Sequence, residues 1–188
     1  MRMTGSGADG AGSRPGTEER GAAAMSGTRG GAAGDGGGPP EVVRRRCDAD
    51  LDDCVAVLAD VHADSGYPHH WPAEPQRWLT PDGLTAAWVA EADGAVLGHA
   101  ALCGREVSRL YVSPGARGRG LGARLLAAVE AEAADRGVRL VLEVKTSDSA
   151  AVALYERRGW VRCGTERQEW SAPGSVAEMV TVHRYEAP

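Results

Sequence analysis

The glycine-rich string Arg117-Gly118-Arg119-Gly120-Leu121-Gly122 is the feature that most constrains the fold of this chain. It follows a strand-like apolar run, Val107 to Val112, and it precedes a long amphipathic run that begins at Leu121. A glycine-rich turn that opens a helix leaves several backbone N–H groups without intrahelical partners. Those donors and the helix dipole together attract negative charge. The spacing therefore predicts a strand-turn-helix unit with an anion site at the turn.

Composition divides the 188 residues into two parts. Residues 1–40 are rich in glycine and contain no aromatic side chain. Such a segment cannot bury enough apolar surface to offset the entropy of ordering it. We expect residues 1–40 to be a disordered tail, with translation starting at Met1 or at Met25. Residues 41–188 are long enough to form one domain with a single buried core.

Charge and cysteine usage narrow the class of protein. The formal net charge of −5 argues against nucleic acid as the main partner. No apolar run approaches the length of a membrane span. The cysteines lie far apart without metal-ligand or redox spacing, so we expect them to be small core residues in a reducing, cytoplasmic compartment. They are Cys47, Cys54, Cys103 and Cys163.

Hydrophobic periodicity predicts the element order β-α-α-β-β-β-α-β-α-β-β. Strands are expected at Val42–Cys47, Ala87–Ala92, Ala95–Leu102, Glu106–Val112, Val138–Val144, Trp160–Glu169 and Met179–Tyr185. Helices are expected from Asp48 or Asp50 to about Val61, at Gln76–Leu79, from Leu121 to Gly137, and at Ser149–Arg158. Asp93-Gly94 is a strong hairpin signal, and the continuous apolar run Val138–Val144 is typical of a strand buried on both faces.

The central strand-helix-strand unit predicts a right-handed parallel crossover, whereas the hairpins on either side of it are antiparallel. A mixed α/β sheet with helices on both faces follows. In such sheets the ligand crevice lies at the strand ends around the crossover. The glycine-rich turn falls at that place.

Two blocks of sequence resemble a known family. Leu110-Tyr111-Val112-Ser113-Pro114, followed by Arg117-x-x-Gly120-x-Gly122, resembles the acetyl-coenzyme A signature of the GNAT N-acetyltransferase superfamily. Leu142-Glu143-Val144 and then Ser147-Asp148-x-x-Ala151-x-x-Leu154-Tyr155-Glu156-x-x-Gly159-Trp160 resemble its later strand-helix block. The resemblance covers about residues 41–188. Asp148 stands where the family often has asparagine, and Trp160 where phenylalanine is usual.

The resemblance implies the GNAT fold, with a mixed, mostly antiparallel sheet, and an enzyme that uses acetyl-CoA. Backbone N–H groups of the turn would receive the pyrophosphate, and the N–H of Val112 would polarise the thioester carbonyl. Arg119 is either solvated or in reach of a phosphate. The residues implied to bind the cofactor are Leu110, Tyr111, Val112, Arg117, Gly118, Arg119, Gly120, Leu121, Gly122, Asp148, Ala151 and Tyr155.

The same resemblance implies two catalytic side chains. Glu106 matches the base that deprotonates the amine in several members, although a solvated strand-edge carboxylate or a water chain is the alternative. Strand alternation puts Glu106, Ser108 and Leu110 on one face unless a bulge near Val112 shifts them. Tyr155 matches the acid that protonates the departing thiolate, with a packing residue as the alternative.

Other readings and partners stay open at this stage. His69 and His70 lack a third ligand at useful spacing, so we expect no metal, and their loop either shapes the acceptor pocket or is an ordinary surface loop. A non-catalytic acyl-CoA sensor is the main alternative function. A phosphate-binding or nucleotide module is a weaker alternative, because no lysine follows the glycines as a P-loop requires. The acceptor amine is not specified by the sequence. The oligomeric state is also left open by the sequence, with a homodimer as the commonest default.

Overall fold

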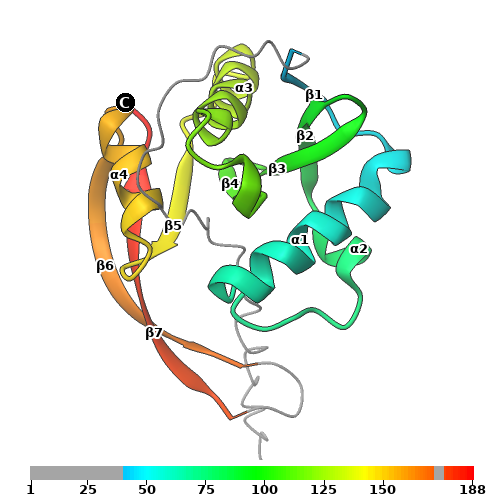
Figure 1. The fold of residues 1–188 in the computed structure, drawn as a ribbon. Coiled ribbons are helices and arrows are strands. Elements are labelled where there is room, and N and C mark those ends of the chain that lie inside the picture. Colours follow the sequence, from blue (N-terminus) through cyan, green and yellow to red (C-terminus); the bar gives the residue numbers. More distant parts are fainter. Residues whose placement is uncertain (1–39, 172–175) are drawn as a thin grey trace, which may run out of the picture.

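The computed structural model describes residues 40–171 and 176–188, which form a seven-stranded sheet in the order β1-β2-β3-β4-β5-β7-β6 (Figure 1). The strands are β1 (Val42–Arg45), β2 (Leu84–Ala92), β3 (Ala95–Cys103), β4 (Glu106–Val112), β5 (Val141–Lys145), β6 (Val161–Trp170) and β7 (Glu178–Glu186). The helices are α1 (Leu51–Ser65), α2 (Pro75–Leu79), α3 (Leu121–Asp135) and α4 (Ser149–Arg157), with 3-10 turns η1 (Asp48–Asp50) and η2 (Pro114–Ala116). The predicted tail, apart from Pro40, lies outside the described residues.

The predicted element order and the mixed α/β sheet are confirmed. Each predicted strand and helix is present, with ends that differ by a few residues. The turn Asp93-Gly94 joins β2 to β3 with positive φ at both residues (53° and 77°), as a two-residue hairpin turn requires. Gly137 follows α3 with φ 64°, which is the usual conformation of a glycine that ends a helix.

Helices cover both faces of the sheet and create two buried clusters (Figure 1). One apolar stripe of α3, together with α4, packs on the face that carries Leu110, Val112 and Val144. On the opposite face, α1 and Leu79 of α2 pack against Val89 and Tyr111. The amphipathic spacing that predicted α1 and α3 thus places each helix against its own side of the sheet.

The buried-strand prediction for residues 138–144 is partly wrong. β5 begins at Val141, because Val138 donates its N–H to Ala133 O (2.9 Å) and still belongs to the end of α3. Leu142 and Val144 are buried, whereas Glu143 and Lys145 are only half-buried. β5 therefore has one fully apolar face, which contacts α3 and α4, and one face that carries polar side chains.

The crossover between β4 and β5 is parallel, as predicted, but the two strands pair only at their start. Glu106 lies opposite Val141, and Val141 N–H donates to Arg105 O (2.9 Å). No further register pair joins β4 to β5 within the described residues. From there to their carboxyl ends the two strands have no register pair, and we call this break in the backbone ladder the β4–β5 opening.

Cysteine exposure corrects one expectation. All four cysteines are free thiols, but Cys47 and Cys163 are exposed, so only Cys54 is a fully buried core residue. Burial raises the pKa of the Cys54 thiol to about 12. In the described part of the chain, no helix is long and apolar enough to cross a bilayer.

Gly98 of β3 lies against the end of β4. A Cβ at this position would stand 2.8 Å from the backbone oxygen of Tyr111 and 3.3 Å from a methyl group of Val112. The backbone oxygen cannot move away without displacing β4. Glycine is therefore required here for steric reasons.

Replacing Gly98 with alanine should lower the free energy of unfolding by about 1–3 kcal/mol, because the added methyl overpacks the contact between β3 and β4. Urea unfolding of the Gly98→Ala variant measures the change. Gly164→Ala on β6 is the matched control, since a Cβ there meets nothing within 4 Å. Equal midpoints for the two variants would contradict this assignment.

Candidate active site

The glycine-rich turn presents a row of unused donors at the start of α3. Gly118 and Gly120 both have positive φ (81° and 76°), and Gly120 is the residue that caps α3. The first bond into the helix runs from Arg124 N–H to Gly120 O (3.1 Å). No acceptor among the described residues bonds the N–H groups of residues 118–123. The turn thus has the geometry that an anion site requires, and the assignment of such a site to it stays a prediction.

The two arginines of the turn behave differently. Arg117 is mostly buried and pairs with Asp64 of α1 (2.5 Å), while its Nε and Nη2 atoms have no partner in the described structure. Arg119 is half-exposed and pairs with Glu41 (3.2 Å). The buried, partly unsatisfied guanidinium of Arg117 adds positive potential beside the turn. The side chain of Arg119 is held instead by the carboxylate that precedes β1.

A β-bulge in β4 determines which way its side chains point. His99 pairs with Tyr111 and Ala101 pairs with Ser108, so two residues of β4, Arg109 and Leu110, lie opposite one residue of β3. Arg109 has φ 51°, a left-handed conformation that is uncommon outside glycine.

The bulge corrects the predicted alternation of β4. Leu110 and Val112 lie in the cluster under α3 together with Val107. Tyr111 lies instead in the cluster under α1. Glu106 and Leu110 consequently occupy opposite faces, so the expectation that they share a face is wrong. The bulge stands at Arg109 rather than near Val112.

Contacts of the Arg109 backbone and side chain hold the bulge. His99 Nδ1 lies 3.0 Å from Arg109 O, and His99 Nε2 lies 3.1 Å from Nη1 of Arg46. Because a guanidinium only donates, Nε2 accepts and Nδ1 carries the proton that is donated to the bulge carbonyl. The Arg109 side chain stacks over Trp78 and donates to its carbonyl oxygen. These contacts offset the cost of the left-handed residue.

At the opening between β4 and β5 one backbone donor has no strand partner. Ser113 N–H donates to Leu97 O of β3 (2.8 Å). Since successive N–H groups of a strand point to opposite edges, the N–H of Val112 points toward β5, where the two strands have separated. Tyr155 of α4 belongs to the same buried cluster as Val112 and Val144.

Tyr155 is fully buried, and its hydroxyl has no hydrogen-bond partner in the part of the chain that the structure describes. Burial and the nearby carboxylate of Asp148 raise the pKa of this phenol well above its usual range, so it stays protonated. Asp148 caps α4 by accepting from Ala151 N–H (3.0 Å). An unsatisfied buried hydroxyl is costly, and it fits a group that bonds a ligand.

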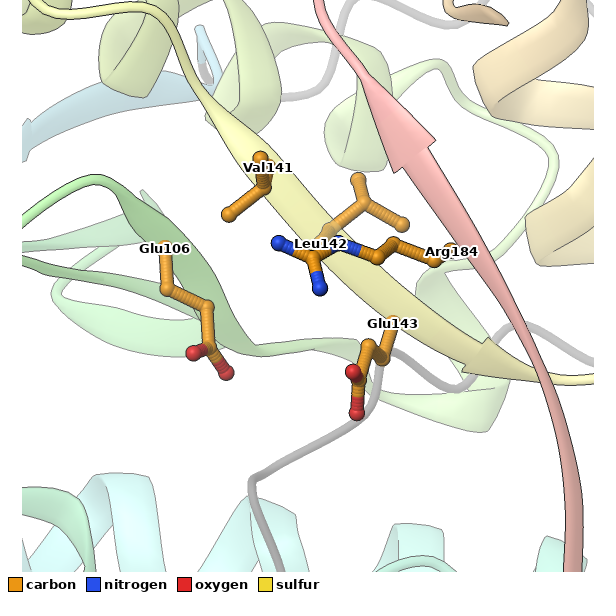
Figure 2. A pocket seen from close by; sticks show the side chains of 5 residues that line it. All are labelled: Glu106, Val141, Leu142, Glu143 and Arg184. Atoms are coloured by element: carbon orange, nitrogen blue, oxygen red, sulfur yellow. The ribbon is translucent and has the colours of Figure 1, made fainter. Parts of the chain in front are cut away.

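A pocket opens on the other face of the sheet, where β4 and β5 begin (Figure 2). Its lining residues are Glu106, Val141, Leu142, Glu143 and Arg184. Figure 2 shows the carboxylates of Glu106 and Glu143 on the same side, with the Arg184 side chain reaching across β5 toward them. Two carboxylates and one guanidinium thus line the same pocket.

Two of these pocket residues were missed by the sequence analysis. Glu143 was read as part of a buried apolar run, and only its alternation with Leu142 and Val144 signals a polar face. Arg184 carries no local signal, because its position depends on the pairing of β7 with β5, in which it lies opposite Glu143.

The loop after α1 reaches the far side of this face. His69 Nδ1 lies 2.9 Å from Lys145 Nζ at the end of β5, and its Nε2 lies 3.0 Å from Glu178 of β7. The ring of His69 also packs edge-on against Trp170. The loop is therefore anchored on β5, β6 and β7 rather than lying free on the surface. No group of residues suited to a metal ion occurs in the described ranges.

Comparison with known proteins supports one family. Residues 62–172 match the family described as the acetyltransferase (GNAT) domain. An uncharacterized protein of Mycobacterium leprae is 33% identical over 149 residues, which cover 75% of this chain and 40% of that protein. The N-alpha-acetyltransferase RimI of Mycobacterium tuberculosis is 36% identical over 96 residues, covering 47% of this chain and 60% of RimI. The chain thus spans 40% and 60% of the lengths of these two relatives.

Solved structures show the same fold. The crystal structure of an N-acetyltransferase from Staphylococcus aureus superposes with a TM-score of 0.65 at 21% identity. The alignment covers 78% of this chain and 97% of that one. At this identity the likeness establishes the fold, and it confirms the architecture that the two sequence blocks implied.

His99 should make the protein sensitive to acid. Burial, with the charges of Arg46 and Arg109 beside it, lowers the pKa of His99 to about 3 from its usual 6.5. Below pH 6.5 the unfolded chain binds a proton that the folded chain excludes, so stability falls as the pH decreases from 6.5 toward 3.

Urea unfolding at pH 7, 6 and 5 measures this loss, which should reach about 2 kcal/mol at pH 5. The His99→Gln variant should be less stable at pH 7 and should lose less stability on acidification than the wild type. Parallel pH dependences in the two proteins would contradict the role given to His99.

Proposed function

The chain belongs to the GNAT family of acetyl-CoA-dependent acetyltransferases, and from this premise we propose that it transfers an acetyl group from acetyl-CoA to an amine by direct attack. The observation that carries the proposal is the coincidence of three unsatisfied groups around the β4–β5 opening. They are the N–H groups of residues 118–123, the N–H of Val112 and the hydroxyl of Tyr155.

The residues of the turn fit the diphosphate of coenzyme A. The donors at the start of α3 receive its negative charge, and the absence of side chains at Gly118 and Gly120 leaves the space for close approach. The guanidinium of Arg117 supplies positive potential beside the turn, whereas the guanidinium of Arg119 keeps its ion pair with Glu41. The backbone of residues 110–112 lines the path of the pantetheine arm, and Leu121, Gly122, Asp148 and Ala151 support the walls of that path.

Bound acetyl-CoA supplies the thioester that carries the acetyl group. The N–H of Val112 donates to the carbonyl oxygen, where negative charge develops, and such a fixed donor contributes about 3–4 kcal/mol. Glu106 accepts the proton of the amine from the pocket side through a chain of water molecules, because the length of β4 separates it from Val112. Tyr155, whose high pKa keeps it protonated, donates its proton to the departing thiolate.

The alternative is a non-catalytic acyl-CoA sensor. Both kinds of protein bind the cofactor, but only an enzyme releases free thiol when amines are added. The pairing of a carboxylate pocket on one face with a buried phenol on the other favours the enzyme. Four free thiols are in keeping with a cytoplasmic location, which we also propose. The homodimer and the absence of nucleic-acid and membrane partners stay predictions from the sequence.

Replacing Gly120 with valine should abolish binding of acetyl-CoA in calorimetry, because the side chain fills the anion site and opposes the positive φ. Gly94→Val is the matched control, since Gly94 has nearly the same φ (77°) and lies in the β2–β3 turn. That variant should lose comparable stability and still bind. Retained binding in the Gly120→Val protein would argue against the assigned site.

Replacing Tyr155 with phenylalanine should lower kcat about 10–100-fold, measured as thiol release, and should change the KM for acetyl-CoA less than twofold. The stability of this variant should be unchanged or higher, because an unsatisfied hydroxyl is removed. Tyr185→Phe is the control: its ring lies 6.0 Å from that of Tyr155, and its hydroxyl bonds Glu156. Unchanged turnover in Tyr155→Phe would leave this tyrosine a packing role only.

A further inference from the structure

Lys145 is the only lysine in the sequence, and it is the last residue of β5, beside the β4–β5 opening. We propose that Lys145 is a site of self-modification, at which bound acetyl-CoA slowly acetylates the side-chain amine when no other acceptor is present. The proposal rests on the proposed function, because the acetyl group comes from the thioester at the N–H of Val112.

The register of β4 and β5 places Lys145 near the level of that thioester. Glu106 lies opposite Val141. Equal counting along the two strands therefore brings Lys145 level with Leu110, two residues before Val112. Two residues correspond to about 7 Å along a strand, a span comparable to an extended lysine side chain.

The Lys145 side chain extends past the end of β5. Its Nζ lies 2.9 Å from Nδ1 of His69 and 5.2 Å from the centre of the Trp170 ring. Trp170 lies opposite Glu178, the first residue of β7. Lys145 lies opposite Val182, later in the same strand. Because β5 and β7 run antiparallel, the start of β7 lies beyond the carboxyl end of β5, and the Lys145 amine extends in that direction.

The amine lies on the face of the sheet that also carries the pocket. Glu143, two residues before Lys145, lines that pocket, and strand alternation puts Lys145 on the same side. Leu142 and Val144 pack in the cluster on the other face, together with the phenol proposed as the acid. The lysine amine and that phenol therefore approach the opening from opposite faces.

His69 is placed to take a proton from Lys145. Since an ammonium group only donates, Nδ1 of His69 accepts from Lys145 Nζ. The other ring nitrogen, Nε2, lies 3.0 Å from a carboxylate oxygen of Glu178, which stabilises positive charge on the ring. Because an imidazole is a weaker base than an alkylamine, the proton transfer is uphill, and the modification is therefore slow.

The chemical step forms an amide and breaks a thioester. The Nζ lone pair bonds to the acetyl carbon, and the bond from that carbon to sulfur breaks. The Lys145 ammonium loses two protons: one reaches the solvent through His69, and the other replaces the proton that Tyr155 gives to the departing thiolate. The amide is uncharged, so the side chain loses its cation–π contact with Trp170.

The test incubates the full chain with acetyl-CoA in the absence of any amine and follows its intact mass. Hydroxylamine treatment first removes acetyl groups carried by cysteine as thioesters. The wild type should then gain the mass of one acetyl group, and fragmentation should place that group on Lys145 rather than on the terminal amine. The Lys145→Arg variant keeps the positive charge and should gain none.

The His69→Gln variant tests the proton acceptor. It should slow the acetylation of Lys145 at least about tenfold and leave the binding of acetyl-CoA in calorimetry unchanged. His183→Gln is the matched control, because His183 packs against Tyr185 on the opposite face of the sheet and should react like the wild type. Equal rates in His69→Gln and the wild type would overturn the role given to His69.

Acetylation by free acetyl-CoA in solution is separated from reaction at the site by two glycine variants. Gly120→Val, which should not bind the cofactor, keeps Lys145 and His69 and should not be acetylated. Gly94→Val should be acetylated at the wild-type rate. Equal acetylation of both variants would identify an uncatalysed reaction and overturn the inference.

Failure of the inference and failure of the proposed function are distinguishable. An unmodified Lys145 in a wild type that binds acetyl-CoA and acetylates added amines would overturn the inference alone. A wild type that neither binds acetyl-CoA nor releases thiol with any amine would contradict the proposed function, and the inference would fall with it.

Discussion

The hydrogen bond from His99 to the carbonyl of Arg109 is the interaction on which the geometry of the site depends. It holds a left-handed residue in the middle of β4 and so inserts one extra residue opposite β3. Glu106, which precedes the bulge along β4, lines the pocket. Leu110 and Val112, which follow the bulge, pack against α3 on the opposite face. A regular strand would have put Leu110 on the pocket side and Tyr111 in the core under α3.

The same bulge accompanies the loss of pairing between β4 and β5. The strands share one register pair at their start, and their separation leaves the N–H of Val112 facing a gap instead of a neighbouring carbonyl. A buried donor without a partner is costly unless a ligand supplies the acceptor. We therefore expect a ligand to occupy the opening. The donors of residues 118–123 belong to the turn between β4 and α3.

The sheet divides the proposed chemistry between its two faces. Tyr155 and the apolar cluster under α3 and α4 lie on the face that receives the leaving thiolate, and burial there keeps the phenol protonated. Glu106, Glu143 and Arg184 line the pocket on the other face, from which Glu106 would act as the base in the proposed reaction. In the proposed reaction, proton removal and proton delivery would therefore occur in different surroundings, which would let each group keep the protonation state that its role requires.

The sequence predicted every strand and helix, the parallel crossover and the glycine turn that opens α3, because these depend on local periodicity and on glycine at particular turns. It considered a bulge near Val112 and did not place one at Arg109, since the contacts of His99 that hold the bulge involve Arg46, the residue that follows β1. Glu143 and Arg184 were missed because they become neighbours only when β7 pairs with β5. Cys47 and Cys163 were wrongly placed in the core, as cysteine spacing carries no information on exposure.

A crystal structure of the complex with acetyl-CoA tests the central claim most directly. The account predicts diphosphate oxygens within about 2.7–3.2 Å of the N–H groups of residues 118–123 and the arm between β4 and β5. The acetyl oxygen should then accept from the N–H of Val112, and the sulfur should lie beside the hydroxyl of Tyr155. A cofactor bound outside the opening, with those donors still unpaired, would contradict the account.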